Sequence, residues 1–141
     1  MAVFNKFNAF VEHVAEKVHN LGADTLKVML TNTAPVAGNT VFADLVEITA
    51  GNGYTATGTA TTITSSAQTS GTYKLVITDI VWTAAGGTIG PFRYAVLYND
   101  TPTSPADPLI GWYDYGSAIS LLTGETLTVD FDATNGVLTL A

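Results

Sequence analysis

Residues 126–132 read Thr-Leu-Thr-Val-Asp-Phe-Asp, and apolar and polar side chains alternate along the whole stretch. Leu127, Val129 and Phe131 would share one face of a β-strand, while the threonines and aspartates share the other. This period of two is typical of a strand with one buried and one solvated face. Asn135-Gly136 follows, which predicts a hairpin turn into a last strand at residues 137–140.

The same period extends through most of the chain toward its N-terminus. In residues 25–31, Leu26, Val28 and Leu30 are predicted to share one face of a strand, and the intervening residues, Met29 and Thr31 among them, the other face. Residues 73–82 are almost continuously apolar, which favours a central strand, whereas the threonine-rich residues 54–65 favour an exposed edge. Further strands are expected at residues 92–98, 109–115 and 119–122. About eight short strands separated by turns predict a mainly β, antiparallel, jelly-roll-like β-sandwich.

The first residues follow a different period. Between residues 3 and 21, apolar side chains recur at steps of three and four, which predicts one N-terminal α-helix with Gly22 just beyond its end. The chain is therefore expected to divide into a helix at 1–22, packed on or leading into the domain, and a β-sandwich domain at 23–141. Three phenylalanines on one stripe fit either a face packed on the sheet or a face that docks on a partner.

Composition excludes several classes of function. The chain has 141 residues, no cysteine, and 12 acidic against 5 basic residues, for a formal net charge of -7. Without cysteine there are no disulfides and no thiolate metal sites. An acidic surface repels phosphate backbones, so nucleic-acid binding is not expected. No apolar run has the length needed to cross a bilayer, so no membrane association is expected either.

The polar residues form no recognisable catalytic or metal-binding motif. His13 and His19 are six residues apart, which would place them on nearly opposite sides of a helix rather than at the spacing of a metal pair. Asp130 and Asp132 begin a segment similar to an oxygen-rich calcium loop, but the acidic residue that would complete it is missing. We therefore expect a protein that is not an enzyme, with no cofactor and no bound metal.

Five aromatic residues on neighbouring predicted strands leave two interpretations open. They are Tyr94, Tyr98, Trp112, Tyr113 and Tyr115. Exposed aromatic rings on adjacent strands can stack on sugar rings, and such a platform would bind a carbohydrate. Aromatic pairs across strands are also ordinary stabilisers of a sheet or of a subunit contact.

Several segments resemble a family of small virion proteins of tailed bacteriophages. They include FNKF at 4–7, LKVMLTNTAP at 26–35, RYAVLYND at 93–100 and GETLTVDF at 124–131, with shorter matches at 47–54 and 136–138. The resemblance implies a capsid decoration (cement) protein, synthesised in the host cytoplasm and located on the capsid surface of the virion. Its expected partners are the major capsid protein and further copies of itself, with a trimer favoured. The alternative is a structural or carbohydrate-binding module associated with the tail or tail fibre.

A docking surface follows from combining these expectations. Phenylalanines on a helix and unpaired edge strands are features that a lone domain has to cover. We therefore expect the partner interface to use the N-terminal helix, the 54–65 edge and the loop at 99–108. The residues expected in it are Phe4, Phe7, Phe10, Tyr54, Thr57, Thr59, Pro102 and Pro105.

Overall fold

The computed structural model of this chain describes residues 2–141. Ten strands and two short helical segments follow one another along it. They are β1 (Phe4–Lys6), α1 (Ala9–Ala15), β2 (Leu26–Thr31), the 3-10 turn η1 (Phe42–Asp44), β3 (Thr59–Ala60), β4 (Ile63–Thr69), β5 (Thr72–Ile77), β6 (Ile80–Thr83), β7 (Ile89–Asn99), β8 (Leu109–Leu121), β9 (Thr126–Val129) and β10 (Leu138–Leu140). Among the described residues, no helix is long and apolar enough to cross a membrane.

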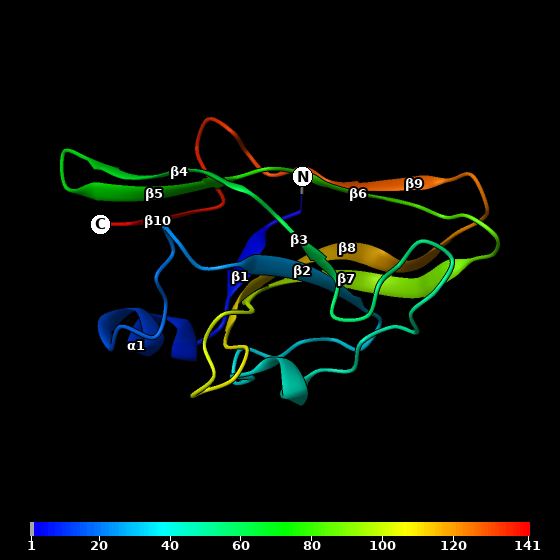
Figure 1. The fold of residues 1–141 in the computed structure, drawn as a ribbon, viewed down its shortest axis with the longest axis horizontal. Helices are drawn as coiled ribbons and strands as arrows, with labels where there is room; N and C mark the ends of the chain where they lie inside the picture. The colour runs from blue at the N-terminus through cyan, green and yellow to red at the C-terminus, as the bar shows by residue number, and fades with distance from the viewer. Residues whose placement is uncertain (1) are drawn as a thin grey trace.

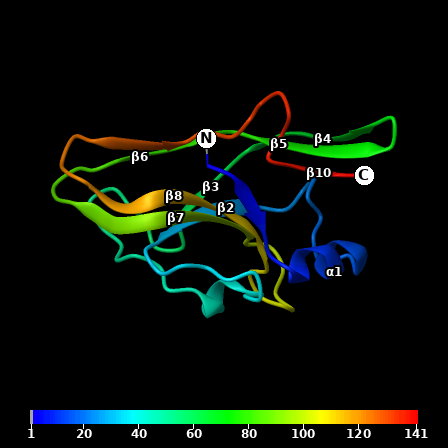
Figure 2. The ribbon, with the colours of Figure 1, turned by 180° about the vertical axis from the view of Figure 1, so that it is seen from behind.

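The strands form two stacked layers. One layer is a five-stranded sheet in the order β1-β8-β7-β2-β3, and the other contains a three-stranded sheet, β10-β5-β4, beside a two-stranded sheet, β6-β9. Figures 1 and 2 show the small sheets on one side of the five-stranded sheet and the η1 loop on its other side, with α1 beyond one end of the sheet. All strand pairs are antiparallel. The expectation of a mainly β, antiparallel, sandwich-like fold with one short helix is thus confirmed.

The main core fills the space between the two layers. Alternate residues of β2 point into it, as the period of two predicts, and together with residues of β7 they meet large side chains from the second layer. Trp82, Phe92 and Phe131 are each at most 3% exposed there. Burying apolar side chains of this size stabilises the fold by about 1.5–3 kcal/mol each.

The opposite face of the five-stranded sheet, where β2 presents Met29 and Thr31, is also buried. Both side chains are fully buried. Met29 belongs to a second cluster with Phe7, Val96 and Tyr98, against which Phe42 and Leu45 of the η1 loop pack. Residues of β2 alternate between its two faces as predicted. The loop between β2 and β3, however, packs on the face that points away from the second layer. The alternating pattern therefore predicted which residues of β2 share a face, but it did not predict that both faces are buried.

The expected helix at residues 3–21 is wrong over most of its length. Residues 4–6 form β1, an edge strand that pairs with β8 through Phe4 opposite Tyr113. The helix starts at Ala9 and ends at Ala15, and Lys17 takes a left-handed φ of 65°, which stops it well before Gly22. Because β1 belongs to the large sheet and Phe10 and Leu21 to the main core, no boundary at residue 22 separates two packing units.

Two predicted strands have different limits in the structure. Residues 73–82 are not one strand but β5 and β6, interrupted at Thr78 and Asp79, where the Asp79 carboxylate accepts a hydrogen bond from the Phe131 N–H at 2.8 Å. Of residues 54–65, only 59–60 and 63–65 are extended. The segments at 109–115 and 119–122 merge into one long strand, β8.

The predicted hairpin at Asn135-Gly136 is also wrong. β9 pairs with β6, whereas β10 pairs with the preceding strand, β5, so the last two strands do not pair with each other. The register of the second pairing is shifted by four residues relative to that of the first. The turn forms, since the Gly136 N–H donates to the Asp132 carbonyl at 2.8 Å. The turn accommodates the four residues by which the registers of the two strand pairs differ.

Candidate functional site

Two of the three phenylalanines expected at a partner interface are core residues. Phe7 is 0% exposed and Phe10 is 1% exposed. The Phe7 ring lies 4.5 Å from the Trp112 ring, and the Phe10 ring lies 5.2 Å from the His19 ring, measured between centroids. These side chains pack within the chain because β1 and α1 fold back on the sheet. They are therefore not free to dock on a partner.

Phe4 and Tyr54 are likewise engaged within the chain. Phe4 is half-buried in β1, with its ring centroid 5.3 Å from that of Tyr113. Tyr54 is buried, its hydroxyl donating to a Glu47 carboxylate oxygen at 2.8 Å and accepting from the Leu30 N–H at 3.0 Å. Tyr54 thus fastens the loop before β3 onto β2, and the expectation that it faces a partner is wrong.

Of the remaining expected residues, Thr57 lies beside a lysine that the sequence did not single out. Lys27 donates to the Thr57 hydroxyl at 3.3 Å and pairs with the Asp100 carboxylate at 2.9 Å. It thereby joins the segment at 54–59 to the loop at 99–108. We call Lys27, Thr57 and residues 99–108 the Lys27 patch. One feature of the sequence points to this residue: Lys27 is the one basic residue within the predicted strand at 25–31.

Local backbone geometry explains how this patch forms. Gly58 has φ of +80°, and a Cβ placed on it would come within 2.0 Å of the Val28 carbonyl oxygen. Only glycine can bring the chain this close to β2 in that conformation. Thr59 then pairs with Val28 in β3, at the edge of the sheet opposite β1. Thr59 and Phe4 therefore lie at opposite edges, so the expected single interface is divided.

The loop part of the patch is half-buried and acidic. Pro102 and Pro105 are both intermediate in exposure. Burial and the neighbouring Asp100 raise the pKa of Asp107, while Lys27 opposes that shift. The Tyr98 hydroxyl donates to the Thr57 carbonyl, which fixes the patch to β7. The patch thus presents two carboxylates and one ammonium on a fixed framework.

The five aromatic residues do not form one platform. Tyr98 and Trp112 belong to the second cluster, below the five-stranded sheet, whereas Tyr113 packs against the main core above it. Tyr94 and Tyr98 are buried, and only Tyr115 is largely exposed, at 60%. Pleating sends adjacent residues of β8 to opposite faces, so a run of aromatic residues in the sequence is split between two sides.

An apolar cleft of about 200 Å³ opens between the two layers. It is lined mainly by β7, β8 and β9, including Phe92, Tyr113, Tyr115, Leu127 and Val129. Burial is the main reason that the pKa of Tyr113 rises to about 12, so this phenol stays neutral near pH 7. The volume is below that of ordinary small-molecule sites and would admit a single ring.

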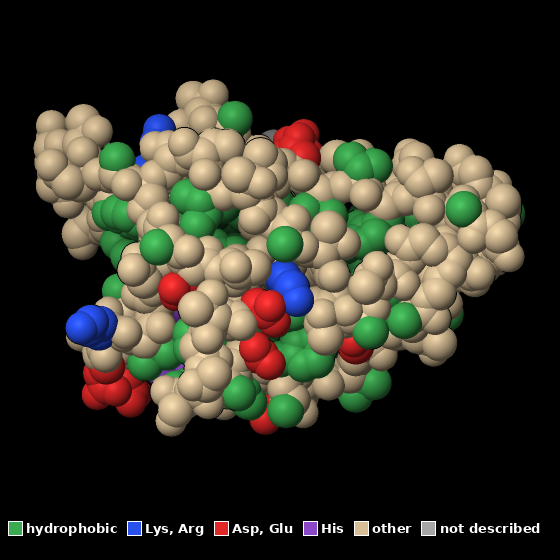
Figure 3. Space-filling view, viewed as in Figure 1, with side chains coloured by type: hydrophobic (Ala, Val, Ile, Leu, Met, Phe, Trp, Pro, Cys, Tyr) green, Lys and Arg blue, Asp and Glu red, His purple; other side chains and the backbone are tan. Residues whose placement is uncertain are grey.

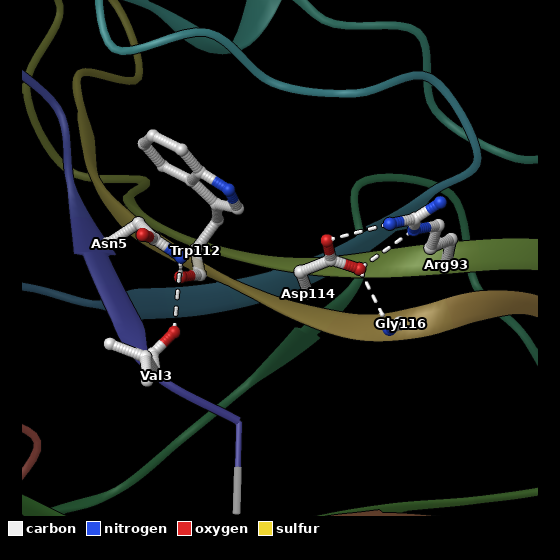
Figure 4. A network of polar contacts seen from close by, with 6 residues as sticks. All are labelled: Val3, Asn5, Arg93, Trp112, Asp114 and Gly116. Carbon is white, nitrogen blue, oxygen red and sulfur yellow. Dashed lines mark hydrogen bonds and ion pairs between the residues drawn. The ribbon is translucent and has the colours of Figure 1, made fainter.

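An ion pair stands beside the cleft on the outer part of the sheet (Figure 4). Arg93 donates to both carboxylate oxygens of Asp114, at 2.8 and 2.9 Å, and the Gly116 N–H donates to the same carboxylate at 2.8 Å. The Arg93 hydrogen bond and that from Gly116 hold the pKa of Asp114 below its ordinary value. These hydrogen bonds fix the irregular part of β8 beside Gly116 to Arg93 of β7.

Of the two aspartates in the segment that resembles a calcium loop, Asp132 caps the backbone of the following turn. Asp132 accepts hydrogen bonds from the Thr134 and Asn135 N–H groups, at 2.8 and 2.7 Å, and from the Asn135 side chain at 2.7 Å. These bonds, chiefly those from Asn135, lower the pKa of Asp132. Asp130 follows the end of β9 and does not join Asp132 in such a cap. Within residues 2–141, no group of three or more His, Cys, Asp or Glu side chains is arranged to hold a metal ion.

The two histidines lie together, contrary to the expectation that they occupy opposite sides of a helix. Because α1 ends at Ala15 and the chain turns back, their ring centroids are 5.8 Å apart. His19 is buried, and its Nδ1 lies 3.1 Å from the Asn99 amide nitrogen, which also donates to Asp24 at 2.6 Å. Burial, reinforced by His13 and opposed by Asp24, lowers the pKa of His19 to about 4.

The fold and its surfaces define a mainly β, sandwich-like protein whose Lys27 patch and apolar cleft lie on different parts of the molecule. Comparison of the chain with protein-family models, with curated proteins and with solved structures found no match.

Proposed function

We propose that this chain is a non-enzymatic virion structural protein of a tailed bacteriophage, acting as a capsid decoration protein that binds the major capsid protein at the capsid surface. The segments that resemble small phage virion proteins motivate the proposal, because they are spread over most of the chain. In this role the protein would bridge and stabilise capsid subunits, and it would assemble with further copies of itself.

One structural observation supports a scaffold role above the others. Six of the twelve acidic residues accept hydrogen bonds from backbone N–H groups and so hold turns and loops in place: Asp24, Asp44, Asp79, Asp114, Glu125 and Asp132. Charge-assisted bonds of this kind are among the stronger hydrogen bonds in proteins. A protein that reinforces a shell needs such stiff loops, because mobile loops would lose conformational entropy on docking.

The Lys27 patch is the docking surface that this proposal favours. It joins Thr57 to the 99–108 loop, it is exposed in part, and it carries more acid than base. An acidic patch on a rigid framework would be attracted to a basic region of a capsid subunit, which affects orientation and association rate more than final affinity. The phenylalanines have no part in this version of the interface.

The location of the protein in a virion is the first test. Particles should contain the protein in a fixed ratio to the capsid subunit, and electron microscopy should show it on the capsid. Particles that lack it should lose resistance to heat or osmotic shock. Location in the tail, or absence from purified particles, would overturn the decoration role.

The docking surface can be tested separately with matched variants. Asp100→Asn combined with Asp107→Asn removes two negative charges from the Lys27 patch. Glu12→Gln combined with Glu16→Gln removes the same charge from the exposed side of α1. We expect the first pair to slow association with stripped particles at low salt, with little effect from the second. Equal effects from both pairs would mean that only net charge matters.

The cleft favours one second candidate, a carbohydrate-binding module of the tail or tail fibre. Tyr113 and Tyr115 line an apolar space of about 200 Å³, and a sugar ring can stack on an aromatic face of this kind. Glycan binding that is lost in Tyr115→Ala and kept in Leu122→Ala would support this candidate. Both side chains are 60% exposed, so the leucine variant controls for loss of exposed apolar surface.

A further inference from the structure

The strand β4 is an unusual edge. It is the last strand of the sheet β10-β5-β4, so one of its sides has no partner strand among residues 2–141. It contains seven residues, whereas the other strands at sheet edges, β1, β3, β6, β9 and β10, contain two to four. Every residue of β4 after Ile63 is exposed. β4 is therefore the longest open edge that the described fold presents.

The register of the hairpin identifies the backbone groups on the open side. Thr69 pairs with Thr72 across the two-residue turn Ser70-Gly71, whose φ angles of 50° and 86° fit a type I′ turn. In such a hairpin the flanking pair exchanges both hydrogen bonds, and alternate residues bond to alternate sides. Thr69 and Ala67 therefore bond to β5, while Ser66 and Gln68 direct their N–H and C=O groups away from it.

This edge has none of the usual protection against pairing. Proteins guard edge strands with charged side chains, proline, bulges or short length. β4 contains no charged residue and no proline, and its one register irregularity, between Ile63 and Ser65, leaves residues 65–69 regular. By contrast, the edge strand β1 is short and contains Lys6, and β9 lies between Glu125 and Asp130.

Charge indicates which partner suits the edge. Residues 48–73 contain no charged side chain, although the whole molecule has a formal charge of -7. Figure 3 shows the end of the molecule that carries the β4–β5 hairpin as almost entirely uncharged, with most acidic and basic side chains gathered below it. Two acidic molecules repel each other over most orientations, and the repulsion is smallest where neutral surfaces meet.

We propose that β4 pairs with β4 of a second copy of this chain, antiparallel about a twofold axis. The two three-stranded sheets would then form one continuous six-stranded sheet, with the outward groups of Ser66 and Gln68 hydrogen-bonded between the copies. Short serine, alanine and threonine side chains let the two backbones approach. The pairing is isologous and closes at two copies, so it predicts a dimer and not the trimer expected from the sequence. It does not rest on the proposed virion role.

Oligomeric state and amide exchange test the pairing directly in the full chain. Sedimentation at increasing concentration should show a monomer–dimer equilibrium. Hydrogen exchange at the Ser66 and Gln68 amides should slow as the dimer population rises, while exchange at the β1 edge should not change. A protein that stays monomeric, or one that associates with these two amides still exchanging freely, would overturn the proposal.

A matched pair of substitutions sharpens the test. Ala67 and Thr139 both lie opposite Lys74, on its two sides, in β4 and β10 respectively. Ala67→Glu would place one negative charge from each copy beside the twofold axis. Thr139→Glu adds the same charge next to the same lysine, but in β10, at the opposite edge of the sheet. We expect Ala67→Glu to weaken dimerisation about tenfold or more, with little change from Thr139→Glu. Equal behaviour of the two variants would place the interface elsewhere.

Discussion

The two faces of the five-stranded sheet are buried by different means. On the face toward the second layer, strands cover strands, and the residues that point inward are those that alternation predicts. On the other face, Met29, Val96 and Tyr98 are covered by a long loop through Phe42 and Leu45, with Phe7 from the N-terminal segment. The first face depends on regular pairing. The second depends on a loop that is held by isolated backbone and side-chain hydrogen bonds rather than by a continuous strand ladder.

A cavity in the inter-sheet core should have the largest effect. Phe92 is 2% exposed and belongs to the main cluster, so Phe92→Ala removes a large buried ring. We expect a loss of about 3–5 kcal/mol in the free energy of unfolding, measured by urea denaturation. Val81→Ala in β6, where Val81 is 57% exposed, is the control and should change stability by less than about 0.5 kcal/mol.

The same kind of change on the loop-covered face should cost less and act locally. Met29→Ala removes a flexible side chain beneath the η1 loop, and we expect a loss of about 2–3 kcal/mol. Amide exchange should increase more in residues 32–46 than in β5, because opening of the loop exposes this face without separating the two layers. A uniform increase across both layers would contradict the distinction between the faces.

Stability should fall in mild acid because of His19, beside the helix. The folded-state pKa of His19 is about 4, below its ordinary value of 6.5. The unfolded chain therefore binds the proton first, and stability declines as the pH falls from about 6.5 to about 4, by at most about 1.4 kcal/mol per pH unit. Thermal unfolding in His19→Gln should show a flatter pH profile over this range, and an unchanged profile would exclude His19 as the cause.

The smallest effect is expected at a buried donor in the inter-sheet core. Trp82 is 2% exposed, and its indole Nε1 has no hydrogen-bond partner. Trp82→Phe removes this unsatisfied donor and also some volume, and the two effects oppose each other. We expect a change in the free energy of unfolding below about 1.5 kcal/mol. A much larger loss would show that ring volume outweighs the unsatisfied N–H.

Predictions from the sequence succeeded where the orientation of a residue depends only on its neighbours in the sequence. Leu26, Val28 and Leu30 of β2 share one face because of pleating, which needs only neighbouring residues. In β7 the register shifts place Phe92 in the main core and Val96 and Tyr98 in the second cluster, although the period of two puts all three on one face. The candidate site was less predictable: Thr57 and the 99–108 loop do share a surface, but Lys27, which joins them, was not identified. Phe4 and Thr59 were assigned to one interface although strand order places them at opposite edges of a sheet.

By itself, the sequence determined the fold class, the acidic net charge and the neutral stretch at 48–73, because these depend on composition and on a period of two. The tertiary structure decided which faces are buried, where the N-terminal segment becomes a strand, and which edge stays open. Phe4 to Lys6 form β1 because β8 offers them a partner, although their spacing fits a helix. Long-range pairing and loop coverage overcome local propensity because they bury far more apolar surface than one short helix could.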